Sequence, residues 1–156
     1  MIGDNLVIKE HHIKSAGEVI KIILPEIKDG IRYVITVGGE SGSGKSEIGH
    51  SIKDLLEKER NIKSVVFQQD DYFIYPPLSN AKKRKEDISW VGMNEVKLEL
   101  LNQHIKQFKE GATTITKPLV IYQEDKVTEE KTELKGINIL IIEGTYTTSL
   151  NNVDYK

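Results

Sequence analysis

The spacing of apolar residues along this chain alternates between the periods of strands and helices. Short apolar runs that stop at glycines or acids predict buried strands at Tyr33–Val37, Ser64–Gln68 and Asn138–Ile142. Between these runs, apolar residues recur every three or four positions, which predicts amphipathic helices starting near Lys45 and spanning Leu98–Phe108. We therefore expect an α/β fold with a doubly wound, mostly parallel sheet and helices on both faces.

The first 30 residues lie outside this alternation. We expect residues 1–30 to extend a core formed by residues 31–150, with the whole chain of 156 residues making a single domain. Leu6–Ile13 is predicted to be a short strand. A helix is expected to follow from Ser15, which starts a capping-box pattern, and to kink or end at Pro25.

Two later segments are less regular. The β-branched residues from Thr113 to Thr132 are interrupted by Gln123-Glu124-Asp125, which predicts a hairpin beside the main sheet. The stretch from Pro76 to Ser89 is polar and reads as a connection between elements.

Composition narrows the class of protein. With 38% hydrophobic and 29% charged residues and a net charge of −2, the chain is typical of a soluble globular protein and gives no reason to expect nucleic acid as a partner. It has no cysteine, which excludes disulfides and thiolate metal sites. No apolar run is long enough to predict a membrane span, so we expect no membrane partner and a cytoplasmic location. Whether the chain forms homo-oligomers is left open.

The most informative motif follows the strand at Tyr33–Val37. It is a complete Walker A pattern (G-x-x-x-x-G-K-[ST]), formed by Gly39, Glu40, Ser41, Gly42, Ser43, Gly44, Lys45 and Ser46. In such a P-loop, backbone N–H groups and the start of the following helix bind the phosphates of ATP. Lys45 would reach the β- and γ-phosphates as a catalytic cation, and the Ser46 hydroxyl would bind Mg²⁺. The alternative is a glycine-rich turn that only caps a helix.

Acidic residues follow two of the predicted strands. Glu143 ends the last strand, where it could bind Mg²⁺ or be a simple exposed acid. Asp70 and Asp71 follow the second strand and would lie at the same edge of the sheet. A carboxylate at this edge can accept the proton of an attacking hydroxyl, although both aspartates could instead cap a turn.

These motifs resemble the uridine kinase and phosphoribulokinase family of P-loop kinases. The resemblance rests on the Walker A sequence, on Gln69-Asp70-Asp71-Tyr72-Phe73 and on Ile142-Glu143-Gly144, and it covers about Ile35 to Leu150. It implies a kinase that transfers the γ-phosphate of ATP to a hydroxyl of a nucleoside, sugar or related small molecule. It also implies that Asp70 is the catalytic base and that Glu143 lies near Mg²⁺.

The residues that would contact the acceptor are less clear from the resemblance. It suggests Asp71, Tyr72 and, weakly, Asp87 as substrate residues. In nucleoside kinases of the family, the inserted hairpin carries Pro-x-Tyr-Asp and a nearby histidine, whereas here the sequence is Pro118-Leu119-Val120-Ile121. This departure weakens uridine as the acceptor. The basic run Lys82–Lys85 could hold a phosphorylated acceptor, contact nucleic acid, for which a larger basic face is usual, or be a solvated loop.

The family continues after its Glu-Gly motif into a lid that carries arginines, so the resemblance implies that this chain is truncated before the lid. We then expect nucleotide binding with slow phosphoryl transfer from these residues alone. Two rival functions remain at this stage: a P-loop NTP hydrolase that uses water, and a nucleotide-binding module without catalysis.

Overall fold

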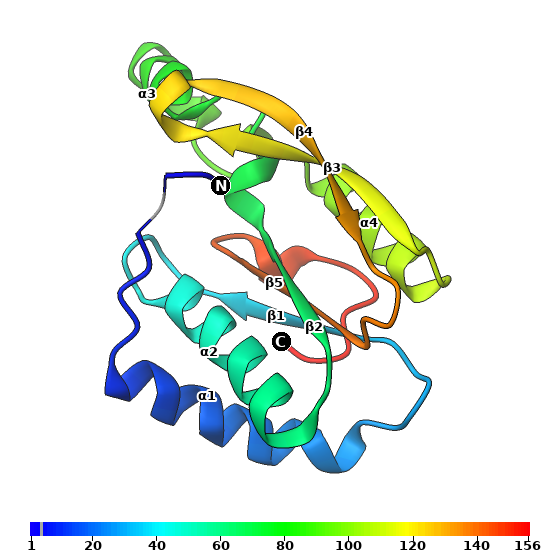
Figure 1. The fold of residues 1–156 in the computed structure, drawn as a ribbon. Coiled ribbons are helices and arrows are strands. Elements are labelled where there is room, and N and C mark those ends of the chain that lie inside the picture. The colour runs from blue at the N-terminus through cyan, green and yellow to red at the C-terminus, as the bar shows by residue number, and fades with distance from the viewer. Residues whose placement is uncertain (4) are drawn as a thin grey trace.

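The computed structural model describes residues 1–3 and 5–156 and contains a parallel sheet, a separate hairpin and several helices (Figure 1). The helices are α1 (Glu10–Ile23), α2 (Lys45–Arg60), α3 (Pro77–Glu86) and α4 (Leu98–Lys109). The strands are β1 (Tyr33–Gly38), β2 (Ser64–Gln68), β3 (Thr114–Ile121), β4 (Lys126–Glu133) and β5 (Ile139–Gly144). Short 3₁₀ turns connect several of these elements.

The main sheet has the strand order β1-β5-β2, and its strands are parallel. In this register, Gly38 of β1 lies beside Gly144 of β5, and Gln68 of β2 lies beside Glu143 of β5. The carboxyl ends of the three strands therefore meet at one edge of the sheet. In parallel α/β sheets this edge is where ligands bind.

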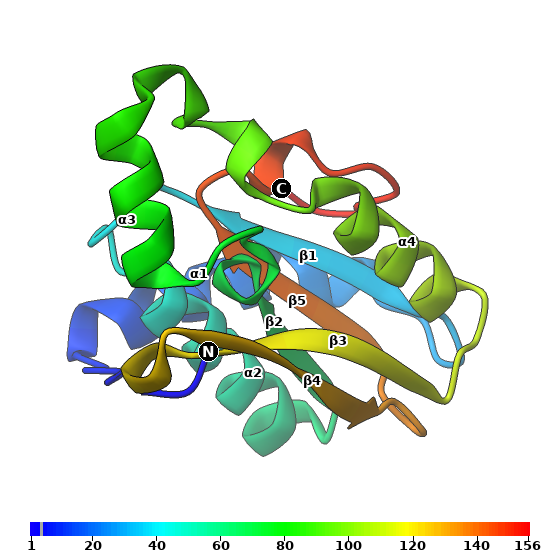
Figure 2. The ribbon, with the colours of Figure 1, turned by 90° about the horizontal axis from the view of Figure 1, so that it is seen from above.

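Helices cover both faces of this sheet, as the sequence predicted. On one face, α1 and α2 pack together against β1 and β5 around Ala16, Ile35, Ile52 and Ile141 (Figure 1). On the other face, α4 buries Leu101, Ile105 and Phe108 against Val34, Phe67 and Leu140 of the strands (Figure 2). Burial of apolar surface on both sides explains why β5 is buried along its whole length.

Strands β3 and β4 form the predicted antiparallel hairpin, separate from the main sheet. The turn between them ends at Asp125, whose φ of 46° is left-handed. The start of the chain lies along this hairpin, because Ile2 donates its N–H to Val120 O (2.8 Å) and accepts from Tyr122 N (3.1 Å). The hairpin and the first residues thus lie above the ligand-binding edge of the sheet (Figure 1).

The structure differs from the sequence-based prediction in two places. The strand predicted at Leu6–Ile13 and the helix start predicted at Ser15 are both wrong, because α1 begins at Glu10 and its buried residues include His12 and Ala16. The polar stretch from Pro76 contains the helix α3, which starts with Pro77 in its first turn. This helix has a single buried residue, Asn80, so it lacks the apolar stripe that would have predicted it.

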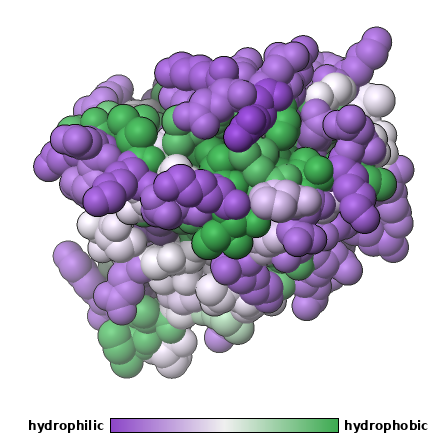
Figure 3. Space-filling model, turned by 90° about the horizontal axis from the view of Figure 1, so that it is seen from below, coloured by the Kyte–Doolittle hydropathy of each residue, from purple (hydrophilic) through white to green (hydrophobic). Residues whose placement is uncertain are grey.

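The face of the molecule around α1 carries exposed apolar residues. Figure 3 shows an apolar area on this side, bordered by hydrophilic residues. Ile22 of α1 is 73% exposed, and a groove between α1 and β1 is lined by residues that include Val19, Ile35 and Val37. Among the described residues, no helix is both long and apolar enough to cross a membrane.

Candidate active site

The Walker A sequence forms the loop between β1 and α2. Gly44 precedes the helix with a φ of 84°, in the left-handed region that favours glycine. Lys45 is the first residue of α2, is largely buried, and lies with its Nζ 3.4 Å from the carbonyl oxygen of Glu40. The loop therefore has its lysine folded back over its own backbone, with the N-terminus of α2 facing the same space.

A histidine that the sequence did not single out packs against this loop. His12 of α1 is largely buried, and a Cβ placed on Gly44 would lie 3.0 Å from its Nε2. The Nδ1 atom accepts a hydrogen bond from the backbone N–H of Lys9 (3.1 Å). No local pattern could reveal this contact, because His12 and Gly44 are brought together only by the packing of α1 on α2.

Glu143 lies at the end of β5, beside the start of α2. It is nearly fully buried. Burial, followed by the nearby Asp70 carboxylate, raises the pKa of Glu143 to about 7. The charge of Lys45 and a hydrogen bond from Ser46 act in the opposite direction.

This pair of oxygen donors is suited to a magnesium ion. The Ser46 hydroxyl and the Glu143 carboxylate are in hydrogen-bond contact beside the P-loop, and both are hard oxygen ligands. The buried carboxylate lacks enough nearby positive charge to keep its pKa at the ordinary value. The residues present therefore fit Mg²⁺, which a P-loop would hold together with the nucleotide phosphates.

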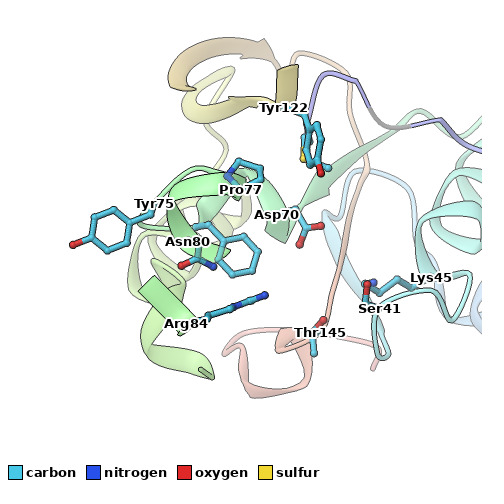
Figure 4. A pocket seen from close by; sticks show the side chains of 11 residues that line it. Ser41, Lys45, Asp70, Tyr75, Pro77, Asn80, Arg84, Tyr122 and Thr145 are labelled. Atoms are coloured by element: carbon cyan, nitrogen blue, oxygen red, sulfur yellow. The ribbon is translucent and has the colours of Figure 1, made fainter. Parts of the chain in front are cut away.

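A cavity of about 230 Å³ connects the P-loop with α3. Its P-loop side is lined by Ser41, Lys45 and Thr145. The rest of the lining consists of Met1, Phe73, Tyr75, Pro77, Asn80, Arg84 and Tyr122. Asp70 lies between these two groups of residues and points into the cavity (Figure 4). The structure thus brings together the predicted catalytic pair, Lys45 and Asp70, in one cavity.

The neighbour of Asp70 faces the other way. Asp71 is buried, accepts a hydrogen bond from Val120 N (3.0 Å) and pairs with Lys117 Nζ (2.8 Å). It therefore joins β2 to the hairpin and is not among the residues that line the cavity. This placement favours Asp70 over Asp71 as the residue that meets an acceptor.

The two remaining predicted substrate residues also lie outside the cavity lining. Tyr72 is fully buried in the core, with its Oη 2.8 Å from His104 Nδ1. Asp87 accepts hydrogen bonds from the N–H and Oγ of Ser89, and so caps a turn after α3. Phe73, which follows Tyr72, is the aromatic residue of this motif that reaches the cavity.

The end of β5 is fixed to the end of β2 by a close backbone approach. A Cβ on Gly144 would lie 2.3 Å from Gln69 Cβ, so only glycine fits at this position. The Gln69 side chain also accepts a hydrogen bond from Tyr146 N (2.7 Å). These contacts hold Thr145 at the cavity and explain the glutamine and the glycine of the two motifs.

A buried polar network supports the far side of the cavity. Glu95 is 0% exposed and accepts hydrogen bonds from Arg84 Nε (2.5 Å), Asn80 Nδ2 (2.7 Å) and Gly92 N (2.9 Å). Burial opposes the ionisation of Glu95, but these hydrogen bonds outweigh it and hold its pKa below the ordinary value. Asn80 in turn accepts from Trp90 Nε1 (2.8 Å). In the sequence, Arg84 stands out only as part of a basic run, because its partner Glu95 is 11 residues away.

A sequence model of the Phosphoribulokinase / Uridine kinase family matches residues 34–155. Uridine kinase of Saccharomyces cerevisiae is 28% identical over 116 residues, which cover 73% of this chain and 22% of the yeast protein. Uridine kinase of Clostridium novyi is 29% identical over 111 residues, which cover 71% of this chain and 51% of that protein. The chain thus spans about half of one relative and less of the other.

Solved structures show the same fold. A structure described as that of a possible uridine kinase from Bacillus stearothermophilus superposes with a TM-score of 0.68 at 22% identity, covering 91% of this chain and 79% of that one. The D-glycerate 3-kinase of Cryptococcus neoformans superposes with a TM-score of 0.60 at 19% identity, covering 89% and 53%.

Proposed function

This chain belongs to the phosphoribulokinase / uridine kinase family, and from that premise we propose that it transfers the γ-phosphate of ATP to a hydroxyl group of a small molecule. The observation that carries the proposal is that Lys45 and Asp70 line the same cavity. Lys45 comes from the phosphate-binding loop after β1, and Asp70 from the turn after β2, with β5 lying between these two strands in the sheet. A γ-phosphate held at the loop would therefore face an acceptor hydroxyl held at Asp70.

In the proposed reaction, the acceptor oxygen forms a bond to the γ-phosphorus while the bond from that phosphorus to the β–γ bridging oxygen breaks. Asp70 accepts the proton of the acceptor hydroxyl, and ADP leaves with the electron pair of the broken bond. Lys45 and the N–H groups of the loop stabilise the charge on the phosphates. Mg²⁺ bound by Ser46 and Glu143 would supply further positive charge to the phosphates.

In this proposal, the acceptor enters the cavity between α3 and the hairpin. Tyr75 and Pro77 line the cavity from the α3 side, and Tyr122 lines it from the hairpin. Related proteins of this fold are described as acting on different acceptors, uridine and D-glycerate among them. Family membership therefore supports the type of reaction, while the acceptor must follow from the residues of this cavity.

The proposal is tested by screening purified protein for ADP release from Mg·ATP with nucleosides, sugars, sugar phosphates, hydroxy acids and small vitamins. We expect one class of acceptor to raise ADP release at least about tenfold over the rate without acceptor. Equal ADP release with and without every acceptor would indicate an NTP hydrolase. Nucleotide binding without ADP release would indicate a binding module.

A further inference from the structure

Arg84 combines two properties that are unusual for one surface arginine. Its side chain is 42% exposed, yet its Nε is bonded to the fully buried Glu95. Figure 4 shows the guanidinium extending from α3 into the cavity, toward the space in front of Asp70. The side chain is thus anchored at one end and presented to the cavity at the other.

The anchor fixes the direction of the guanidinium. Glu95 receives three hydrogen bonds, one each from Arg84, Asn80 and Gly92. Its negative charge is therefore well satisfied inside the protein, and Glu95 is not among the residues that line the cavity. Arginine has five N–H donors, and the bond through Nε leaves the two Nη groups on the cavity side of the guanidinium.

An arginine that only stabilised the fold by pairing with Glu95 would not need an exposed side chain. Arg84 also lies over the ring of Phe73, with 5.7 Å between its Cζ atom and the ring centre, a distance within the range of cation–π contacts. Phe73 and Arg84 both line the cavity. The contact holds the plane of the guanidinium in place, which reduces the entropy lost when a ligand binds.

We propose that Arg84 forms an anion-binding subsite in the acceptor half of the cavity, so that the alcohol phosphorylated here carries a carboxylate or a phosphate group. This inference rests on the proposed function. Planar guanidinium groups recognise both anions through paired hydrogen bonds. Asp70 lies between Arg84 and the P-loop. If Arg84 holds the anion of the acceptor, a hydroxyl of the same molecule would therefore be directed to Asp70.

The first test measures anion binding directly. Trp90 is the only tryptophan in the chain and donates its Nε1–H to Asn80, so its fluorescence reports on the network that holds Arg84. Inorganic phosphate is titrated into protein whose P-loop is filled by Mg·AMP-PNP, in the wild type, Arg84→Gln and Lys85→Gln. Lys85 is the matched control, because it is the next residue on α3 and is exposed.

We expect Arg84→Gln to weaken phosphate binding at least about tenfold and Lys85→Gln to leave it unchanged. AMP-PNP affinity should be the same in all three proteins. Equal phosphate binding in the wild type and Arg84→Gln would overturn the subsite, even if the variant melts at a lower temperature. Failure of AMP-PNP to bind to the wild type would instead count against the proposed function.

The second test separates the two anions by means of matched acceptors. ADP release is compared for D-glycerate against glycerol, and for ribose 5-phosphate against ribose. We expect the charged member of at least one pair to have a kcat/KM at least about tenfold higher, and this advantage to disappear in Arg84→Gln through a higher KM. Arg84→Lys should restore part of it, because it keeps the charge but loses the paired hydrogen bonds. A preference for neutral acceptors that is the same in Arg84→Gln would overturn the inference and leave the kinase function standing.

Discussion

Asp71 and Lys117 form a buried ion pair, with 2.8 Å between Oδ2 and Nζ, that joins the end of β2 to the β3–β4 hairpin. Lys117 also lies 3.0 Å from Glu130 on the neighbouring strand. The adjacent Asp70 lines the cavity instead. The side chains of two consecutive aspartates thus point in different directions: Asp71 attaches the hairpin, and Asp70 faces the cavity.

This division predicts that the same substitution acts on turnover at one position and on stability at the other. Asp70→Asn should lower acceptor-dependent turnover by about a hundredfold or more, because an amide cannot accept the hydroxyl proton. Its nucleotide affinity should stay near that of the wild type. Single-turnover assays with separate nucleotide titrations measure both quantities, and a larger loss of turnover in Asp71→Asn would show that the base was assigned to the wrong aspartate.

Asp71→Asn should act on stability. It leaves Lys117 buried without its main partner, which typically costs about 3 kcal/mol. Denaturant titration measures the loss. The double variant Asp71→Asn/Lys117→Met should recover part of it, because the unpaired charge is removed as well. If Asp71→Asn unfolded at the same denaturant concentration as the wild type, the ion pair would not hold the hairpin.

Lys45→Ala should weaken ATP binding or turnover by at least about tenfold, because it removes the cation that the P-loop directs at the β- and γ-phosphates. Isothermal titration with Mg·ATP and a turnover assay measure the two quantities. Lys53→Ala on the same helix is a suitable control, because Lys53 lies two turns beyond the loop. Nucleotide affinity and rate that are unchanged in Lys45→Ala would contradict the assignment of the loop.

Glu143→Gln should raise the Mg²⁺ concentration needed for half-maximal activity at least about tenfold, because it removes a charged oxygen ligand. The same change should raise the melting temperature of the metal-free protein at neutral pH. Burial raises the pKa of Glu143 from the ordinary value of 4.5 to about 7. The folded protein therefore loses stability as the pH rises from 4.5 toward 7, because the unfolded chain ionises this group more readily. Exposed Glu124 provides a control, as Glu124→Gln should change neither quantity. An unchanged Mg²⁺ requirement in Glu143→Gln would exclude it as a ligand.

His104 should make the fold less stable in acid. Burial, followed by the charge of Lys117, lowers its pKa below the ordinary value of 6.5. The folded protein then binds the proton less readily than the unfolded chain, so stability is full above pH 6.5 and is lost as the pH falls below it. His104→Asn should reduce this loss by up to about 1.4 kcal/mol per pH unit, whereas His11→Asn at an exposed position should not. Denaturant titrations at several acidic pH values measure the free energy of unfolding. If it fell equally steeply with pH in the wild type and in His104→Asn, His104 would not be responsible for the loss.

The sequence alone predicts the parts of the site that lie within continuous motifs. The P-loop, the acid after β2 and the acid at the end of β5 could all be predicted, because parallel strands bring their carboxyl ends to one edge. The hairpin could be predicted from its β-branched residues and its polar turn. The relative positions of Asp70 and Asp71 required the structure, since two neighbouring residues in a turn carry no periodicity that fixes their directions.

The parts that could not be predicted depend on contacts between distant segments. His12 meets Gly44 only because α1 packs on α2, and Arg84 meets Glu95 only because the chain returns after α3. Helix α3 itself has no apolar stripe, since its one buried residue is the polar Asn80. Hydrophobic periodicity therefore could not reveal either the helix or the arginine that it carries into the cavity.

In the proposed function, the γ-phosphate of ATP ends on an alcohol. The most direct measurement follows the radiolabel of γ-labelled ATP, with Mg²⁺ and the best acceptor of the screen, in the wild type and in Asp70→Asn. We expect the label to appear in the phosphorylated acceptor and the transfer to be about a hundredfold slower or more in the variant. Label found only in inorganic phosphate, at a rate independent of the acceptor, would contradict it.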